Sequence, residues 1–93
     1  MNAATAAYTL PAPGQVHIGT FVKTPSAQVI EVLGLAGLDF AVLDAEHAPW
    51  DRGTLDLALL AGRAAGLPLL VRVADRSAAS TLSVLDQGAA GIV

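Results

Sequence analysis

A unit of helix, glycine and apolar strand recurs three times along the chain and limits its possible folds more than any other feature. The copies read LAGLDFAVLD, AAGLPLLVRV and DQGAAGIV, and in each one a glycine separates the end of a predicted helix from an apolar run. Strands that are apolar on both faces and alternate with helices of roughly ten to fifteen residues are typical of parallel sheets with right-handed crossovers. The repeat therefore predicts an α/β fold.

Turn and cap residues divide this pattern into four strands and three helices. The strands are predicted at QVHIGTFV (15–22), DFAVLD (39–44), LPLLVRV (67–73) and AGIV (90–93), and the helices within 24–37, 51–65 and 77–87. Thr24 is the expected N-cap of the first helix, with Pro25 at its first position and Gly37 closing it.

The ends of the other two helices carry similar signals. Gly66 is expected to close the second helix, where leucines recur at helical spacing. Ser77 is expected to cap the third helix, and Gly88 follows its end.

Two architectures fit this order, an open doubly wound sheet and a (β/α)8 barrel. The dinucleotide fingerprint G-x-G-x-x-G does not follow the first strand, and the chain has no P-loop, which favours the barrel. A barrel needs eight units and about 250 residues, whereas this chain has 93. We therefore predict the first three to four βα units of a TIM (β/α)8 barrel over 15–93, ending after the fourth strand begins, and a flexible N-terminal tail over 1–14.

Composition excludes several classes of protein. The net charge is −3, from 8 acidic and 5 basic residues, and no basic cluster occurs, so neither nucleic acid nor an anionic membrane is an expected partner. The most apolar stretch, Leu55–Val73, is interrupted by charged residues and a proline and therefore cannot be a membrane span. The absence of cysteine excludes disulfides and thiol catalysis and is compatible with a cytoplasmic enzyme.

Polar residues follow two neighbouring strands in the stretch FAVLDAEHAPWD and near the end of LPLLVRV. Asp44, Glu46 and His47 come after the second strand, and Arg72 lies near the end of the third. In parallel α/β folds the carboxyl ends of the strands carry the functional groups. We expect a guanidinium beside two carboxylates and an imidazole, a set that can hold a small anion and move a proton.

Each of these residues also has a structural interpretation. Arg72 could simply neutralise Asp44 or Glu46 as an ion pair without a catalytic purpose. His47 could be an ordinary surface or packing histidine, which is our interpretation of His17. Adjacent Glu46 and His47 do not form the helical H-E-x-x-H zinc motif or another recognisable metal site.

Asp86 stands near the end of the third predicted helix, where the helix dipole disfavours a negative charge. It is either a solvated carboxylate or a partner for an imidazole. In the second case it would stabilise the protonated ring and make that histidine a stronger base.

Together these segments resemble a known family. The stretch GTFVKTPSAQVIEVLGLAGLDFAVLDAEHAP, then VRV, then LDQGAAGIV is similar to the amino-terminal part of the HpcH/HpaI aldolase family, over about Gly19 to Val93. These are metal-dependent class II pyruvate aldolases related to 4-hydroxy-2-oxoheptanedioate aldolase and 2-dehydro-3-deoxyglucarate aldolase. The most specific element is D-x-E-H-A-P after the second strand.

The resemblance implies a lyase that cleaves a 4-hydroxy-2-oxo acid to pyruvate and an aldehyde, with a divalent cation (Mg, Mn or Co) chelated by the oxo acid. It implies His47 as the base acting on the hydroxyl through water, Asp86 as the group that raises its basicity, and Arg72 as the group that stabilises the pyruvate enolate. Asp44 and Glu46 are then a supporting network that orients Arg72, His47 or metal-bound water.

The family's metal ligands lie on later strands, so no metal ligand is expected within this chain. Family members are usually homo-oligomers, which we carry over as an expectation for the complete protein. Two alternatives stay open. The first is a catalytically inactive fragment or assembly module without a metal site, and the second is a citrate-lyase-like enzyme acting on acyl-thioesters, against which D-x-E-H-A-P argues.

Overall fold

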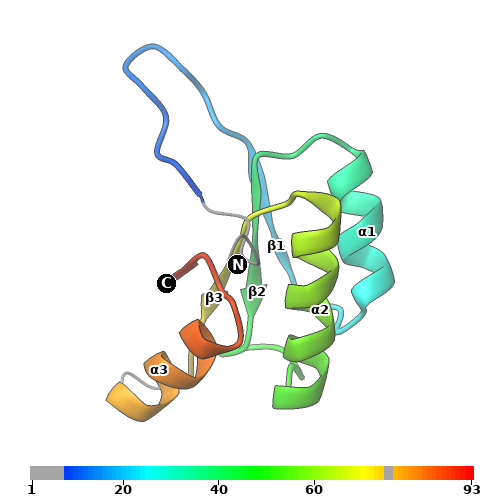
Figure 1. Cartoon of the computed structure of the whole chain (residues 1–93), viewed down its shortest axis with the longest axis vertical. Coiled ribbons are helices and arrows are strands. Elements are labelled where there is room, and N and C mark those ends of the chain that lie inside the picture. The colour runs from blue at the N-terminus through cyan, green and yellow to red at the C-terminus, as the bar shows by residue number, and fades with distance from the viewer. Residues whose placement is uncertain (1–7, 75–76) are drawn as a thin grey trace.

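The computed structural model describes residues 8–74 and 77–93 and shows four strands alternating with three helices (Figure 1). The predicted tail over 1–14 falls partly outside the described residues, at 1–7, and the division into tail and barrel portion stays a prediction. In chain order the elements are β1 (Gly19–Val22), α1 (Ala27–Leu35), β2 (Phe40–Asp44), α2 (Arg52–Ala65), β3 (Leu69–Arg72), α3 (Ala78–Asp86) and β4 (Gly91–Ile92).

The four strands form one parallel sheet in the order β1-β2-β3-β4. Each strand pairs with the next one in the sequence, as in a barrel, whereas a doubly wound sheet reverses its strand order at a switch point. The predicted α/β fold with the first βα units of a barrel is therefore confirmed. Parallel pairing also brings the carboxyl ends of all four strands to the same edge of the sheet.

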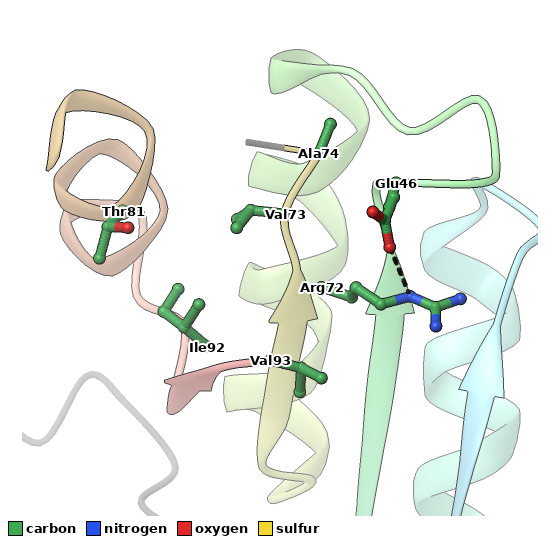
Figure 2. A pocket seen from close by; sticks show the side chains of 7 residues that line it. All are labelled: Glu46, Arg72, Val73, Ala74, Thr81, Ile92 and Val93. Carbon is green, nitrogen blue, oxygen red and sulfur yellow. Dashed lines mark ion pairs between the residues drawn. The ribbon is translucent and has the colours of Figure 1, made fainter. Parts of the chain in front are cut away.

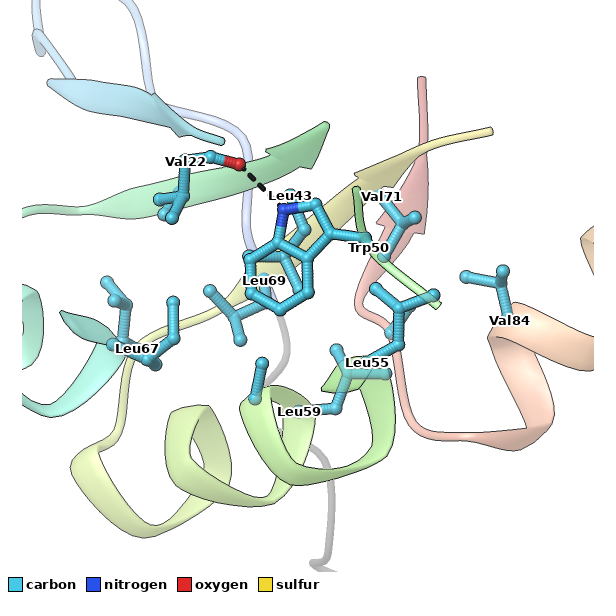
Figure 3. Close-up of a cluster of buried hydrophobic side chains, with 13 residues drawn as sticks. Val22, Leu43, Trp50, Leu55, Leu59, Leu67, Leu69, Val71 and Val84 are labelled. Atoms are coloured by element: carbon cyan, nitrogen blue, oxygen red, sulfur yellow. Dashed lines mark hydrogen bonds between the residues drawn. The ribbon is translucent and has the colours of Figure 1, made fainter. Parts of the chain in front are cut away.

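Helices α1 and α2 lie side by side over one face of the sheet, and α3 lies beyond β3 (Figure 1). Alternate residues of β2 and β3 pack against leucines of α2, as Figure 3 shows in part. The side chains with the least exposure in this core include Ile30, Ala41, Leu43, Ala58, Leu59, Leu67 and Val71. Because the core takes every second strand residue, the intervening residues lie on the opposite face of the sheet.

Two predicted boundaries at the start of the fold were wrong. The first strand begins at Gly19, not at residue 15, because the N–H of Ile18 donates to the Asp39 side chain at 2.7 Å instead of joining the ladder. Helix α1 begins after Ser26, not after Thr24. The Ser26 N–H donates to the Thr24 carbonyl at 2.8 Å, so Pro25 lies in a tight turn and not in the helix.

Gly66 and Ser77 lie at the helix ends predicted for them, whereas the cap at the start of α2 was not predicted. Asp51 is the N-cap of α2: its side chain accepts from the Thr54 N–H at 2.8 Å, and the Thr54 hydroxyl accepts from the Asp51 N–H at 2.9 Å. Gly66 ends α2 with a left-handed φ of 71°. The side chain of Ser77 accepts from the Ser80 N–H at the start of α3. Within the described residues, no helix is long and apolar enough to cross a membrane.

The contact between α2 and β3 generates a stability prediction. A Cβ added at Gly62 would lie 2.5 Å from Leu69 Cδ1 and 3.0 Å from the Leu67 carbonyl oxygen. Gly62→Ala should therefore lower the free energy of unfolding by about 1–3 kcal/mol, as overpacked core substitutions do. Urea denaturation monitored by Trp50 fluorescence would measure the change.

Gly53→Ala in the same helix is the matched control. Its added Cβ would meet only the Asp51 side chain, at 3.6 Å, an ordinary contact. Alanine is a better helix former than glycine by about 0.8–1 kcal/mol, so this variant should be at least as stable as the parent. Equal stability of the two variants would contradict the close packing of α2 on β3.

Candidate active site

A buried ion pair joins the carboxyl ends of β2 and β3. Asp44 and Arg72 are direct neighbours across the two strands, and their side chains meet side on. Arg72 Nη2 donates to Asp44 Oδ2 at 2.6 Å, and Arg72 Nε donates to Oδ1 at 3.1 Å. The Asp44 side chain is fully buried, whereas that of Arg72 is 27% exposed. The pair therefore presents its positive member, and not its negative one, to the surroundings.

The same carboxylate fixes the loop that follows β2. Asp44 Oδ1 also accepts the backbone N–H groups of Glu46, at 3.1 Å, and His47, at 2.9 Å. The hydrogen bond from Arg72, against the opposing effect of burial and with help from these N–H groups, holds the pKa of Asp44 well below its usual range. Asp44 raises the pKa of Arg72 in turn. Both groups are therefore charged at neutral pH.

Glu46 lies between the guanidinium and the imidazole. Its Oε1 is 3.6 Å from Arg72 Nε, an approach drawn in Figure 2, and 3.3 Å from His47 Nε2. The His47 side chain is 62% exposed. The structure thus brings together four of the five predicted site residues. Their side chains contact one another in the spatial order Asp44, Arg72, Glu46, His47.

Asp86 is the fifth predicted residue, and the structure does not bring it to His47. It is the last residue of α3, and its side chain is exposed. Among the described contacts of His47, the carboxylate next to the imidazole is Glu46. The role of Asp86 stays a prediction. His17 lies elsewhere and pairs with Tyr8, whose hydroxyl is 3.0 Å from His17 Nδ1.

A pocket of about 410 Å³ adjoins the pair. Glu46 and Arg72 provide its charged side, while α3 adds the Thr81 hydroxyl and most of the remaining lining is apolar (Figure 2). The full lining is Glu46, Arg72, Val73, Ala74, Thr81, Ile92 and Val93. Such a pocket can bind a small anion at the guanidinium and hold an apolar group beside it.

The sequence patterns did not identify two aromatic residues that support the site, Trp50 and Phe21. The Trp50 indole N–H donates to the Val22 carbonyl at 3.0 Å and anchors the end of the loop to β1 (Figure 3). A buried indole needs such an acceptor, so the chain's one tryptophan could have been suspected. The ring of Phe21 lies 4.7 Å from Arg72 Cζ. Phe21 pairs with Val42, two residues before Asp44, so strand alternation could have placed it on the same face.

The described residues do not provide a metal site. No three His, Asp or Glu side chains within 8–74 and 77–93 come close enough together to hold an ion. Asp44 is already engaged by Arg72 and by two backbone N–H groups. A divalent cation therefore does not fit the described residues as its only ligands.

Curated aldolases match most of the chain. A 5-keto-4-deoxy-D-glucarate aldolase of Salmonella paratyphi A is 42% identical over 74 residues, which cover 80% of this chain and 29% of that enzyme. An enzyme of the same name from Klebsiella pneumoniae matches with the same identity and coverage. The chain therefore spans less than a third of the length of the curated relatives it matches. No protein-family model matches the chain.

Solved structures have the same fold over 80% of the chain. The HpcH/HpaI aldolase from Desulfitobacterium hafniense has a TM-score of 0.75 and 28% identity, covering 80% of this chain and 29% of its own. The citrate synthase SbnG has a TM-score of 0.76 and 38% identity, covering 80% of this chain and 30% of its own. The sheet and helices described above thus correspond to the amino-terminal portion of larger proteins.

The ion pair predicts how stability depends on pH. The folded-state pKa of Asp44 lies below its ordinary value of 3.8, so the charged group stabilises the fold above that value, and this contribution is lost as pH falls towards the folded-state pKa. We expect the free energy of unfolding to be insensitive to Asp44 between pH 5 and 7 and to decline below about pH 4. Asp44→Asn should show a smaller decline, since its side chain does not titrate.

Asp51 is a second source of acid sensitivity, because the N–H and hydroxyl of Thr54 also lower its pKa. Some acid sensitivity should therefore persist in Asp44→Asn. Asp51→Asn is the control that measures this second contribution. The carboxyl carbon signal of Asp44, followed by NMR, gives a direct test even if the variant unfolds. Titration of that signal at pH 3.8 or higher would contradict the assigned ion pair.

Proposed function

The chain corresponds to the amino-terminal part of HpcH/HpaI-family proteins, and from that premise we propose that it supplies the enolate-stabilising and proton-transferring residues of a carbon–carbon lyase. The complete barrel would cleave a 4-hydroxy-2-oxo acid to pyruvate and an aldehyde. The observation that carries the proposal is the guanidinium of Arg72, fixed by a buried carboxylate at the carboxyl end of the strands and exposed to a pocket.

Arg72 would bind the oxo-acid end of the substrate. When the carbon–carbon bond breaks, negative charge develops on the oxygen of the former oxo group, giving the pyruvate enolate. A preorganised cation at that oxygen stabilises the transition state more than the ground state. Asp44 supports this role, because it holds the guanidinium in one place and keeps its charge.

His47 would remove the proton from the 4-hydroxyl group, through a water molecule. The electrons of the O–H bond then form the aldehyde carbonyl, and those of the C3–C4 bond form the enolate, which is later protonated to pyruvate. Glu46 Oε1, 3.3 Å from His47 Nε2, supports this role because it can hold the imidazole in place beside the pocket. Asp86 would have the role that the family resemblance implies, if the complete protein brings it to the ring.

The proposed reaction also uses a divalent cation, Mg, Mn or Co, as implied by the family resemblance. Its ligands would come from residues other than those described, because the described residues do not form a metal site. Such an ion supplies Lewis-acid chemistry when bound. The complete protein would take a small 2-oxo acid as its substrate and act as a homo-oligomer.

A second candidate is carbon–carbon bond formation or cleavage with an acyl-thioester or tricarboxylate substrate. The similarity to the citrate synthase SbnG, at 38% identity, favours it. The curated relatives are aldolases, so we place the aldolase reaction first. A thioester assay beside the aldol assay separates the two candidates, and absence of both activities would support the inactive assembly module.

The proposal is tested by exchange of the pyruvate methyl protons with deuterium in the complete protein that carries this segment, supplied with Mg, Mn or Co. Arg72→Lys should slow exchange and aldol cleavage by about 10²–10³-fold, as loss of an oxyanion donor does. His47→Ala should slow cleavage by about 10²–10⁴-fold, as loss of a general base does. NMR spectroscopy measures the first reaction and aldehyde release the second.

His17→Ala is the matched control, because His17 is the chain's other histidine and contacts Tyr8 instead of the site. Its rates should equal those of the parent. Exchange at the parent rate in Arg72→Lys would refute the role assigned to Arg72, and cleavage at the parent rate in His47→Ala would refute the role assigned to His47.

A further inference from the structure

The ring of Phe21 lies beside the guanidinium that the proposed reaction uses. It is the third residue of β1, and the centre of its ring is 4.7 Å from Arg72 Cζ. The Phe21 side chain is 50% exposed, and it does not belong to the hydrophobic core. On the face of the sheet opposite the core, its ring contacts the side chain of Arg72.

We propose that Phe21 is a positioning residue for Arg72, which fixes the tilt of the guanidinium plane for binding a carboxylate or enolate oxygen. The identity of the bound oxygen rests on the proposed function, whereas the contact between Phe21 and Arg72 does not. Arginine stacks on aromatic faces through cation–π attraction.

The contacts of Arg72 show why a second restraint is needed. Asp44 bonds Nε and Nη2, along one edge of the guanidinium. Two hydrogen bonds along one edge fix that edge, but they leave the plane free to tilt about the line joining them. The Phe21 ring, whose centre is 4.7 Å from the guanidinium carbon, opposes this tilt. Asp44 and Phe21 therefore restrain different movements of the same group.

The orientation of the guanidinium plane also sets the direction of its remaining donors. A guanidinium has five N–H donors, all in its plane, and the contact with Asp44 uses Nε–H and one N–H of Nη2. Within the described part of the chain, Nη1 makes no hydrogen bond. A restraint on the plane therefore also orients the donors that Asp44 leaves available. A planar carboxylate or enolate, which binds in plane, would use them.

The test uses the 93-residue chain and the Nε–Hε signal of Arg72 in ¹H–¹⁵N NMR spectra. Phe21→Leu keeps an apolar side chain but removes the ring, so exchange of the Arg72 Hε proton with water should become at least threefold faster. Phe21→Trp keeps an aromatic face and should exchange at the parent rate. Phe40→Leu is the matched control, because Phe40 is the only other phenylalanine and its ring contacts Tyr8.

Titration with oxalate, a planar mimic of the pyruvate enolate, tests the consequence for binding. The dissociation constant should rise about two- to fivefold in Phe21→Leu, the range for loss of an exposed cation–π contact, and stay unchanged in Phe21→Trp and Phe40→Leu. Equal Hε exchange in the parent and Phe21→Leu would overturn the positioning role. Faster Hε exchange in Phe21→Leu, with pyruvate exchange and aldol cleavage in the complete protein unaffected by Arg72→Lys, would confirm the positioning role and count against the proposed function instead.

Discussion

The buried carboxylate of Asp44 is the group on which the arrangement at the carboxyl ends of the strands depends. It is completely buried and negatively charged, a state that is costly unless the charge is compensated. Compensation comes from Arg72 on β3 and from the N–H groups of Glu46 and His47. One side chain therefore joins two strands, shapes the loop after β2 and sets the position of the only guanidinium in the pocket lining. Removing Asp44 would affect all three at once.

The hydrophobic layer beneath the site supplies the rigid base for this group. Leu43 and Val71 precede Asp44 and Arg72 on their strands and are fully buried against the helices. Strand alternation then requires the charged pair to face the opposite side of the sheet. Trp50 adds a second anchor, since its bond to Val22 attaches the far end of the loop to β1. The loop is thus held at both ends, which keeps Glu46 between Arg72 and His47.

Much of this arrangement could be predicted from the sequence, for identifiable reasons. The glycine-separated repeat predicted parallel strands, and parallel pairing placed Arg72 beside the residues that follow β2. The sequence patterns could not reveal that Asp44 accepts hydrogen bonds from both Arg72 and the loop N–H groups, because side-chain partners depend on strand register and burial. The predicted cap at Thr24 was wrong for a similar reason: the turn at Pro25 moves the start of the helix to Ser26, whose side chain makes no capping hydrogen bond. Phe21 was missed because its partner is 51 residues further along the chain.

An ion pair that serves only stability and one that serves binding differ in how the two partners are exposed. In the first case the best arrangement satisfies the donors of both groups within the protein, since desolvated donors without partners cost free energy. Here the acceptor is saturated and buried, while the donor keeps 27% exposure and lines a pocket. The hydrogen bonds of Asp44 therefore all lie inside the fold, whereas Arg72 has donors that Asp44 does not use. This asymmetry is what an anion-binding role requires, and it arises from residues of neighbouring strands that the parallel register makes adjacent.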